Sequence, residues 1–401
     1  MDYYLMHKDR TLAVFTLEEE VKLCSINKKY VEYLPLSIKK VLSFKDAYVE
    51  SEDDALLNLN EEGSFLIDQW LNNREIPVTR DNKEKYLKRT SSRKFMLEVH
   101  ACSLNDCYWV MQDDEELMWD NVKLYNSVHI GNMIDIENSS SYSPVNSTLG
   151  GQLEKYWYTK DVDGSINLRL CKKEKNTNII IIREVIASQL YKRLDTLQYC
   201  DYNFVYNTVG DIVGCSCDVF TSEDVEMITA YDLLEEVNCT QVDDVFEKII
   251  ERAVSYGIEE SLAQKYMDVQ TIVDYLITNR DRHQGNIAFL RDSETLEIIG
   301  PAPVFDSGSS RFYERELPES VLNTTINGLY KTEMECLEHV TDFSLVDIDK
   351  LLSAEEYREY LLLSNERNSR IDDLLKLYED KINWLRERQY GNVQQMNIFE
   401  K

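Results

Sequence analysis

The chain has 401 residues and a formal net charge of −29, from 73 acidic and 44 basic side chains. Hydrophobic residues make up 43% and charged residues 29%, which excludes a wholly disordered chain and predicts two or three folded domains. The acidity argues against direct binding to nucleic acid or to an anionic membrane. The net charge is −9 over residues 1–140, +3 over residues 141–200 and −23 over residues 201–401. The basic segment is either a chance grouping or the place where a small polyanion binds.

The sequence shows no sign of export. It has no apolar run of about 18 residues, so no transmembrane helix is expected. The start, Met1–Tyr4, lacks the basic-then-apolar pattern of a signal peptide. The nine cysteines show neither a disulfide framework nor the paired spacing of a zinc site. These features predict a protein of the reducing cytoplasm.

Residues 1–137 are expected to form a small α+β domain. Short β-like runs at Leu12–Thr16 and Cys107–Met111 accompany a helical stretch at Phe65–Leu71. This part carries no chemical motif, which favours an interaction or scaffold domain. The polar, serine-rich stretch Asn138–Asn146, which contains a proline, predicts a domain boundary.

Residues 138–222 are expected to form a β-rich lobe with one helix. Strand-like runs at Tyr156–Tyr158 and Ile166–Cys171 flank a turn, as in a β-hairpin. Apolar residues at helical spacing then predict a helix over Ile182–Leu194.

Residues 223–401 are expected to form a helical lobe. Helical spacing of apolar residues dominates residues 240–290 and 343–390. The predicted class is therefore α+β, with a β-rich lobe before a helical one.

The most specific motif is Asn279–Asn286, which reads Asn-Arg-Asp-Arg-His-Gln-Gly-Asn. Twenty residues further on, Asp306 follows another apolar run and precedes Ser-Gly. Phosphoryl transfer from ATP needs a carboxylate beside the acceptor hydroxyl and oxygen ligands for magnesium. Asp281, the last residue of the motif and Asp306 supply these groups. The alternative is a loop whose polar side chains only cap the backbone, but it leaves His283 and Asp306 unexplained.

The basic segment contains the other parts that a kinase needs. Gly150 and Gly151 form the only Gly-Gly pair, and glycines let backbone N–H groups approach phosphate oxygens. Lys172 ends a strand-like run, and Glu184 lies at the start of the next helix. In kinases a strand lysine binds the nucleotide phosphates and is oriented by a helix glutamate. Each feature alone is better explained as an ordinary turn or a solvated charge, but their order favours a kinase. Lys173 follows directly, so the ATP-contacting lysine stays open, although strand alternation favours Lys172.

These motifs resemble those of the bacterial HipA-like serine/threonine kinases, with the CtkA-type members nearest in style. The resemblance covers about residues 140–390. It implies a bilobal fold related to protein kinases and phosphatidylinositol kinases, with Mg-ATP as the cofactor and a serine or threonine of a protein as the acceptor. It also implies a toxin role, with an antitoxin or regulatory protein as partner. Residues 1–135 show no evident match to the small N-terminal domain of HipA.

The resemblance assigns roles to single residues. Asp281 would be the catalytic base, and Asn286 and Asp306 would bind magnesium. His283 would act in the catalytic loop, more as a brace than in proton transfer. Ser147 matches a loop serine that can be autophosphorylated in the family. The residues expected to contact ATP are Lys172, Glu184, Ser147, Thr148, Gly150, Gly151 and the hinge residues Asp218, Val219 and Phe220.

Two other functions are compatible with the same motifs. Asp-Arg-His-x-x-Asn is also the catalytic loop of phosphatidylinositol kinases, so a lipid kinase is the first alternative. The long interval from Asn286 to Asp306 counts against it, as does the acidic C-terminal half, which an anionic bilayer repels. An ATP-binding pseudokinase scaffold is the second, and the presence of every catalytic group counts against it.

Overall fold

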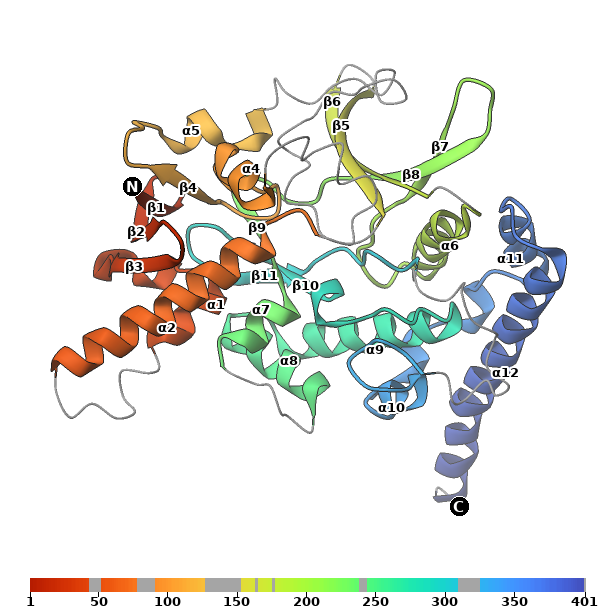
Figure 1. Ribbon diagram of the computed structural model, residues 1–401. Helices are drawn as coiled ribbons and strands as arrows, with labels where there is room; N and C mark the ends of the chain where they lie inside the picture. Colours follow the sequence, from red (N-terminus) through yellow and green to blue (C-terminus); the bar gives the residue numbers. More distant parts are fainter. Residues whose placement is uncertain are drawn as a thin grey trace. The chain divides into compact units, whose positions relative to one another are not determined.

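The computed structural model describes residues 1–42, 52–77, 91–126, 153–162, 165–174, 177–237, 244–308 and 325–399 (Figure 1). The chain forms two compact units and passes between them several times, so that each unit is built from separated stretches of sequence. The division into three consecutive domains that the sequence predicts stays a prediction. The first unit comprises Met1–Leu170, Thr221–Asp243 and Leu290–Glu297; the second comprises Cys171–Phe220, Asp244–Phe289 and Ile298–Lys401.

The described strands form three sheets, with the orders β3-β2-β1-β4, β5-β6-β8-β7 and β11-β10-β9. Together with the helices they confirm the α+β class. None of the helices in the described ranges has the length and apolar character needed to cross a lipid bilayer. The strands are β1 Asp2–His7, β2 Arg10–Leu17, β3 Val21–Ile26, β4 Tyr108–Gln112, β5 Glu154–Val162, β6 Ser165–Lys173, β7 Asn203–Tyr206, β8 Ile212–Asp218, β9 Val225–Thr229, β10 Ala288–Asp292 and β11 Ile298–Pro301. The α-helices are α1 Leu36–Lys39, α2 Glu52–Asn73, α4 Ser92–Glu98, α5 Trp119–Val122, α6 Ile179–Leu194, α7 Ala230–Glu235, α8 Val245–Ser255, α9 Glu260–Leu276, α10 Glu333–Glu338, α11 Ala354–Leu361 and α12 Asn368–Phe399.

The first unit packs helix α2 against the antiparallel sheet that contains β1, β2 and β3 (Figure 1). Alternating strand residues such as Leu12 and Phe15 point into the core, because successive side chains in a strand face opposite sides. Helix α2 buries a stripe that includes Leu66 and Trp70 at helical spacing.

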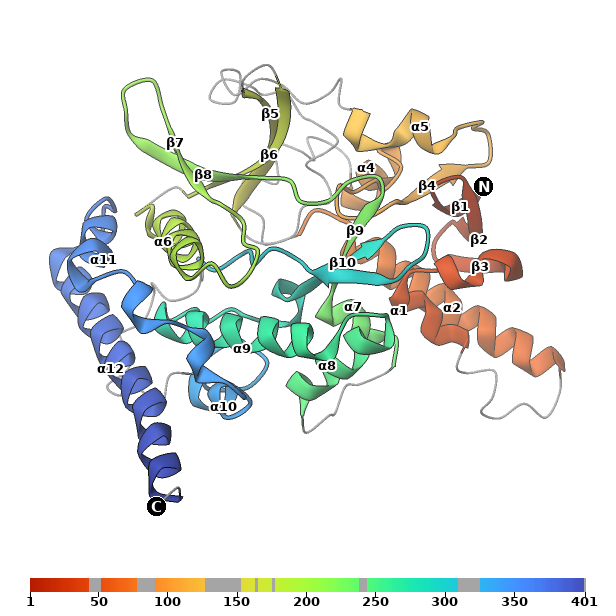
Figure 2. The same ribbon diagram turned by 180° about the vertical axis from the view of Figure 1, so that it is seen from behind.

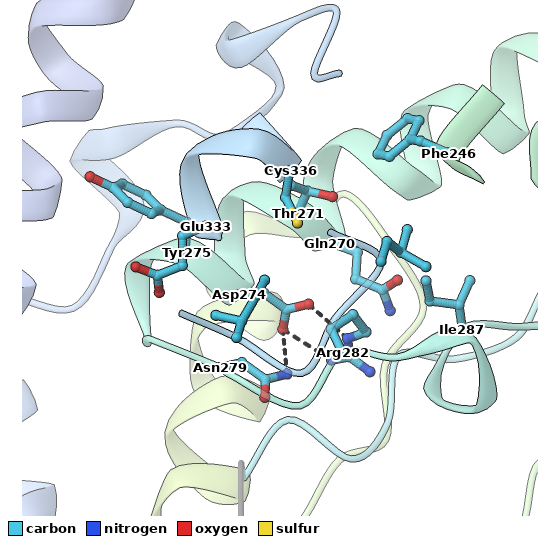
Figure 3. A pocket seen from close by; sticks show the side chains of 12 residues that line it. Phe246, Gln270, Thr271, Asp274, Tyr275, Asn279, Arg282, Ile287, Glu333 and Cys336 are labelled. Carbon is cyan, nitrogen blue, oxygen red and sulfur yellow. Dashed lines mark hydrogen bonds and ion pairs between the residues drawn. The ribbon is translucent and has the colours of Figure 1, made fainter. Parts of the chain in front are cut away.

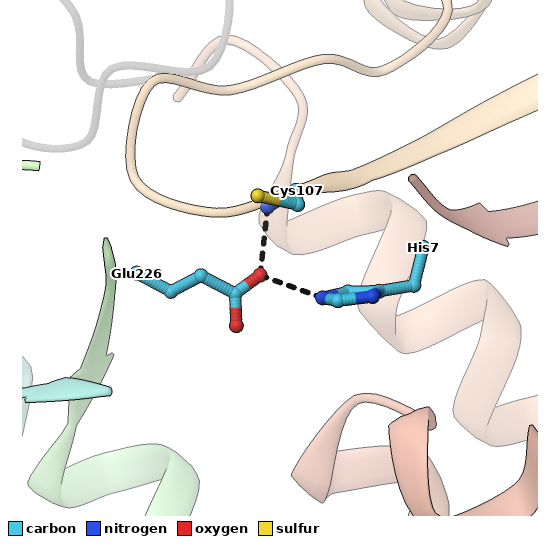
Figure 4. A group of neighbouring side chains, drawn as sticks. All are labelled: His7, Cys107 and Glu226. Atoms are coloured by element: carbon cyan, nitrogen blue, oxygen red, sulfur yellow. Dashed lines mark hydrogen bonds and ion pairs between the residues drawn. The ribbon is translucent and has the colours of Figure 1, made fainter. Parts of the chain in front are cut away.

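A buried polar cluster joins the strands of this unit (Figure 4). The Oε1 atom of Glu226 accepts a hydrogen bond from the Cys107 backbone N–H at 2.8 Å and lies 2.9 Å from Nε2 of His7. Its Oε2 atom accepts two hydrogen bonds from the Arg291 guanidinium. Burial alone would raise the pKa of Glu226, but the charge of Arg291 and the contact with His7 outweigh it and hold that pKa well below its usual range. Both carboxylate oxygens are thus satisfied by donors, so the cluster is explained as a fold-stabilising network.

Helix α9 is the central helix of the second unit (Figure 2). Helices α8, α10 and α12 all contact it. Its C-terminal half, Tyr266–Leu276, is buried almost continuously, Thr271 excepted, and the buried residues include the polar Asp268, Gln270 and Asp274. The helix therefore holds the loop that follows it in a fixed position within the unit.

Candidate active site

Three buried charged side chains fix the point where α9 ends and the Asn279–Asn286 loop begins. Thr278 adopts a φ of 57°, a left-handed conformation that is uncommon for a β-branched residue. Arg183 donates to its carbonyl at 2.8 Å, and Lys381 of α12 donates to its hydroxyl at 2.9 Å. Lys381 also pairs with Glu333 at 2.7 Å. Burial lowers the pKa of Lys381 to about 8, although the charge of Glu333 opposes the shift.

Arg282 holds the loop together from within. Its guanidinium binds both oxygens of Asp274, at 2.7 and 3.0 Å (Figure 3). Its Nη1 atom donates to the carbonyls of Asn286 and Phe305, at 2.7 and 2.6 Å, and Nη2 donates to Ser307 Oγ at 2.9 Å. Burial alone would lower the pKa of Arg282, but the charge of Asp274 raises it above its ordinary value. One guanidinium thus brings the end of the loop beside the segment that carries Asp306.

Sequence reasoning did not single out Arg282 or Asp274. An arginine in a polar loop is expected to be solvated, and only the folded chain shows that both members of this pair are less than 10% exposed. The one feature of the sequence that could have indicated this pair is the position of Arg282 inside the motif, next to Asp281.

A pocket lies behind the loop, with a cavity volume of about 30 Å³ (Figure 3). The Asp274–Arg282 ion pair and Asn279 form part of its wall, and the Nδ2 atom of Asn279 donates to Asp274 at 2.8 Å. The remaining lining comes from α8, α9, α10, Ile287 directly before β10, and residues 326 and 329. The loop is therefore held by specific polar contacts where it borders this pocket.

The loop presents Asp281, Asn286 and His283 in defined orientations. Asn286 donates from Nδ2 to the Asp281 carbonyl at 3.0 Å, which leaves its amide oxygen as the atom available to a metal ion. His283 accepts the N–H of Gly285 on Nδ1 at 3.0 Å and so caps the short helix Gln284–Asn286. This contact stabilises the conformation of the loop. The roles of all three residues stay predictions.

Lys172 lies between two carboxylates. Its ammonium group pairs with Glu184 and, at 2.7 Å, with Oδ1 of Asp306. Glu184 also accepts the backbone N–H of Ser307 at 3.0 Å, which links helix α6 to the Asp306 segment. Burial alone would lower the pKa of Lys172, but the charges of Asp306 and Glu184 outweigh it and raise that pKa well above its ordinary value. Lys172 is 2% exposed, whereas Lys173 is half-buried, so the geometry favours Lys172 as the functional lysine.

The turn after Asp306 requires its glycine. Asp306 itself adopts a φ of 55°, which aspartate tolerates better than most residues. A Cβ atom on Gly308 would lie 2.7 Å from the Ile180 carbonyl and 2.9 Å from Cγ of Glu184. Only glycine lets the segment approach the start of α6 this closely. The Asp-Ser-Gly sequence therefore serves to bring Asp306 to Lys172.

The other expected ATP contacts are placed only in part. Asp218 ends β8 and is exposed, while Val219 and Phe220 are half-buried. The ring centroids of Phe220 and Phe305 lie 6.1 Å apart, so this stretch approaches the residue before Asp306. Four expected phosphate-loop residues fall outside the described residues: Ser147, Thr148, Gly150 and Gly151.

Asn286 and Asp306 have the chemistry of a magnesium site. Arg282 binds the backbone of Asn286 and of Phe305 with the same nitrogen, so the two candidate ligands lie on adjoining segments. One offers an amide oxygen and the other a carboxylate, and oxygen ligands of this kind suit magnesium. Asp306 is 33% exposed in its side chain, which makes it reachable by an ion.

The backbone is similar to that of a solved toxin–antitoxin protein. HipA of Shewanella oneidensis MR-1, solved in complex with HipB and operator DNA, matches over 97% of this chain and 97% of its own, with 14% sequence identity and a TM-score of 0.54. The chain has the HipA fold. The match covers 97% of the chain, so it extends into residues 1–135, where the sequence shows no evident match to the small N-terminal domain of HipA.

A second solved structure is also similar. The proinflammatory kinase CtkA of Helicobacter pylori matches over 61% of this chain and 94% of its own, with 16% identity and a TM-score of 0.44. No protein-family model and no curated protein sequence matches the chain.

Proposed function

We propose that this protein is a HipA-like kinase that transfers the γ-phosphate of Mg-ATP to a serine or threonine hydroxyl of a protein. The observation that carries the proposal is the placement of Lys172 between Glu184 and Asp306. The segment of Asp306 is in turn bound to the catalytic loop by Arg282. A kinase needs a lysine for the phosphates, a glutamate that orients it and an aspartate for the metal. Sequence positions as far apart as 172 and 306 meet here in one arrangement.

The exposure of Asp306 supports a cation site. The ammonium group of Lys172 contacts the carboxylates of both Glu184 and Asp306. Glu184 is 1% exposed and closed to an ion, whereas the side chain of Asp306 is 33% exposed. A carboxylate oxygen that solvent can reach is a suitable ligand for magnesium.

The mechanism assigns one task to each side chain. Asp281 accepts the proton of the acceptor hydroxyl and aims that oxygen at the γ-phosphorus. Lys172 binds the nucleotide phosphates, and Glu184 holds its ammonium group in place. Asn286 and Asp306 would hold magnesium, which would supply positive charge beside the phosphates. Arg282 and His283 keep the loop in shape.

The proposal extends to partners and setting. HipA of Shewanella oneidensis is bound to HipB and operator DNA in its solved complex. By analogy, this chain is the toxin of a toxin–antitoxin pair, acts in the cytoplasm, and binds an antitoxin protein. With a net charge of −29, it meets DNA through that partner and not directly. The loop serine Ser147 is proposed as an autophosphorylation site.

Transfer of radiolabel from γ-labelled ATP tests the proposal. The purified chain is incubated with Mg-ATP alone, with a serine-rich acceptor protein, and with phosphatidylinositol vesicles. We expect label on protein from the wild type and from Asp201→Asn, an exposed control in the same unit. The label is expected to disappear in Asp281→Asn and in Asp306→Asn. Label confined to the lipid would identify a lipid kinase, and ATP binding without any label would identify a scaffold.

A further inference from the structure

A short turn lies against the candidate catalytic base. It runs from Thr325 to Thr332, which pair as an antiparallel bridge, and is closed by a hydrogen bond from Ile326 N–H to the Lys331 carbonyl at 2.8 Å. Helix α10 begins directly after it, at Glu333. The turn is therefore a defined element that leads into a helix of the same unit.

The turn contacts the catalytic loop through its backbone and through one side chain. The backbone N–H of Asn327 donates to the Arg280 carbonyl at 2.7 Å. Its Nδ2 atom donates to Oδ1 of Asp281, also at 2.7 Å. A Cβ atom on Gly328 would lie 3.4 Å from the Arg282 carbonyl, so the turn runs directly along the loop. Among the described residues, Asn327 makes the only hydrogen bond to the Asp281 carboxylate.

Tyr330 anchors the turn at its other end. Its hydroxyl donates to Oδ1 of Asp244 at 3.0 Å and accepts the backbone N–H of Phe246 at 3.2 Å. Its ring stacks on His339 with the centroids 4.4 Å apart. These contacts bind the turn to the start of α8 and to the end of α10, so the position of Asn327 is set by the helical scaffold.

We propose that Asn327 is a positioning residue for Asp281, and this inference rests on the proposed kinase function. A carboxylate offers two oxygens to an acceptor hydroxyl, and both can rotate into place. With Oδ1 held by the Asn327 amide, Oδ2 is the oxygen that faces the hydroxyl. The amide thereby fixes the direction from which the proton is taken, without touching ATP or the acceptor.

A competing reading makes Asn327 an inhibitor that occupies the place of the acceptor. The two readings predict opposite changes when the amide is removed. A positioning residue raises the rate of transfer, so its loss lowers kcat. An inhibitory residue blocks the acceptor, so its loss raises kcat.

Steady-state kinetics of phosphoryl transfer separate these readings. Variants Asn327→Ala and Asn327→Asp are compared with Asn203→Ala, which removes an exposed asparagine of the same unit. In Asn327→Ala we expect kcat to fall about 10- to 100-fold, the equivalent of one hydrogen bond to a charged group. KM for ATP is expected to stay within about twofold, because only an interaction made with ATP would change it.

Asn327→Asp keeps the shape of the side chain and places a second carboxylate beside Asp281, so its kcat is expected to fall at least as far as in Asn327→Ala. Urea unfolding of each variant shows that it is folded. If the wild type transfers phosphate and Asn327→Ala is as fast or faster, the inference fails and the proposed function stands. If the wild type transfers none, the proposed function fails and takes the inference with it.

Discussion

Replacing Arg282 by glutamine removes a buried positive charge and most of its hydrogen bonds. The guanidinium is 7% exposed and its partner Asp274 is 6% exposed, so the carboxylate would be left in the interior without a counter-charge. Breaking a buried ion pair by removing one member costs about 3–5 kcal/mol of unfolding free energy. The variant also loses the bonds to the carbonyls of Asn286 and Phe305, so the loop and the Asp306 segment are expected to separate and phosphoryl transfer to cease.

Urea unfolding followed by circular dichroism measures the loss of stability. The matched control is Arg193→Gln, because Arg193 pairs with Glu356 while its side chain is 38% exposed. Exposed pairs of this kind contribute less than about 1 kcal/mol. The double variant Asp274→Asn/Arg282→Gln carries no charge at either of these two positions and should recover part of the loss. A loss of unfolding free energy in Arg282→Gln no larger than in Arg193→Gln, or a double variant less stable than the single one, would contradict this prediction.

Two further predictions concern the buried lysines. In Lys172→Met, calorimetry is expected to show an affinity for ATP that is lower by about tenfold or more, because Glu184 holds Lys172. Lys173→Met is expected to lower this affinity only slightly, and a larger loss in Lys173→Met would reverse the assignment. Burial lowers the pKa of Lys381 from its ordinary 10.5 to about 8. Between pH 8 and pH 10.5 the unfolded chain therefore binds a proton that the folded chain lacks, so the unfolding free energy rises with pH in this window. The unfolding free energy of the wild type should gain about 2 kcal/mol relative to Lys381→Met between pH 7.5 and 9.5, and a constant difference would contradict this shift.

The sequence predicts those parts of the site whose structure follows from the local spacing of apolar residues. The apolar spacing that predicts a helix over Ile182–Leu194 corresponds to α6, which carries Glu184 toward Lys172. The strand pattern likewise places Lys172 at the end of β6. These elements are predictable because burial imposes a period of two or 3.6 residues on the chain.

Contacts between distant segments leave no such pattern. Arg282 and Asp274 look like solvated charges until the chain folds around them. Asn327 lies 46 residues from Asp281 and belongs to no motif, so nothing in the sequence indicates that they meet. The same holds for residues 1–135, whose similarity in fold to HipA rests on backbone arrangement and not on residue identity. The predicted phosphate loop at Ser147–Gly151 stays a prediction.

The most direct test of the account is a comparison of γ-phosphate transfer and ATP binding in the wild type and in Asp281→Asn. Within the described part of the chain, no hydrogen bond or ion pair joins Asp281 to Lys172, Glu184 or Asp306, so its substitution should leave the affinity for Mg-ATP unchanged. We expect the wild type to phosphorylate protein, and Asp281→Asn to bind ATP equally well but transfer no phosphate. Equal rates of transfer in both proteins, or no transfer by the wild type, would contradict it.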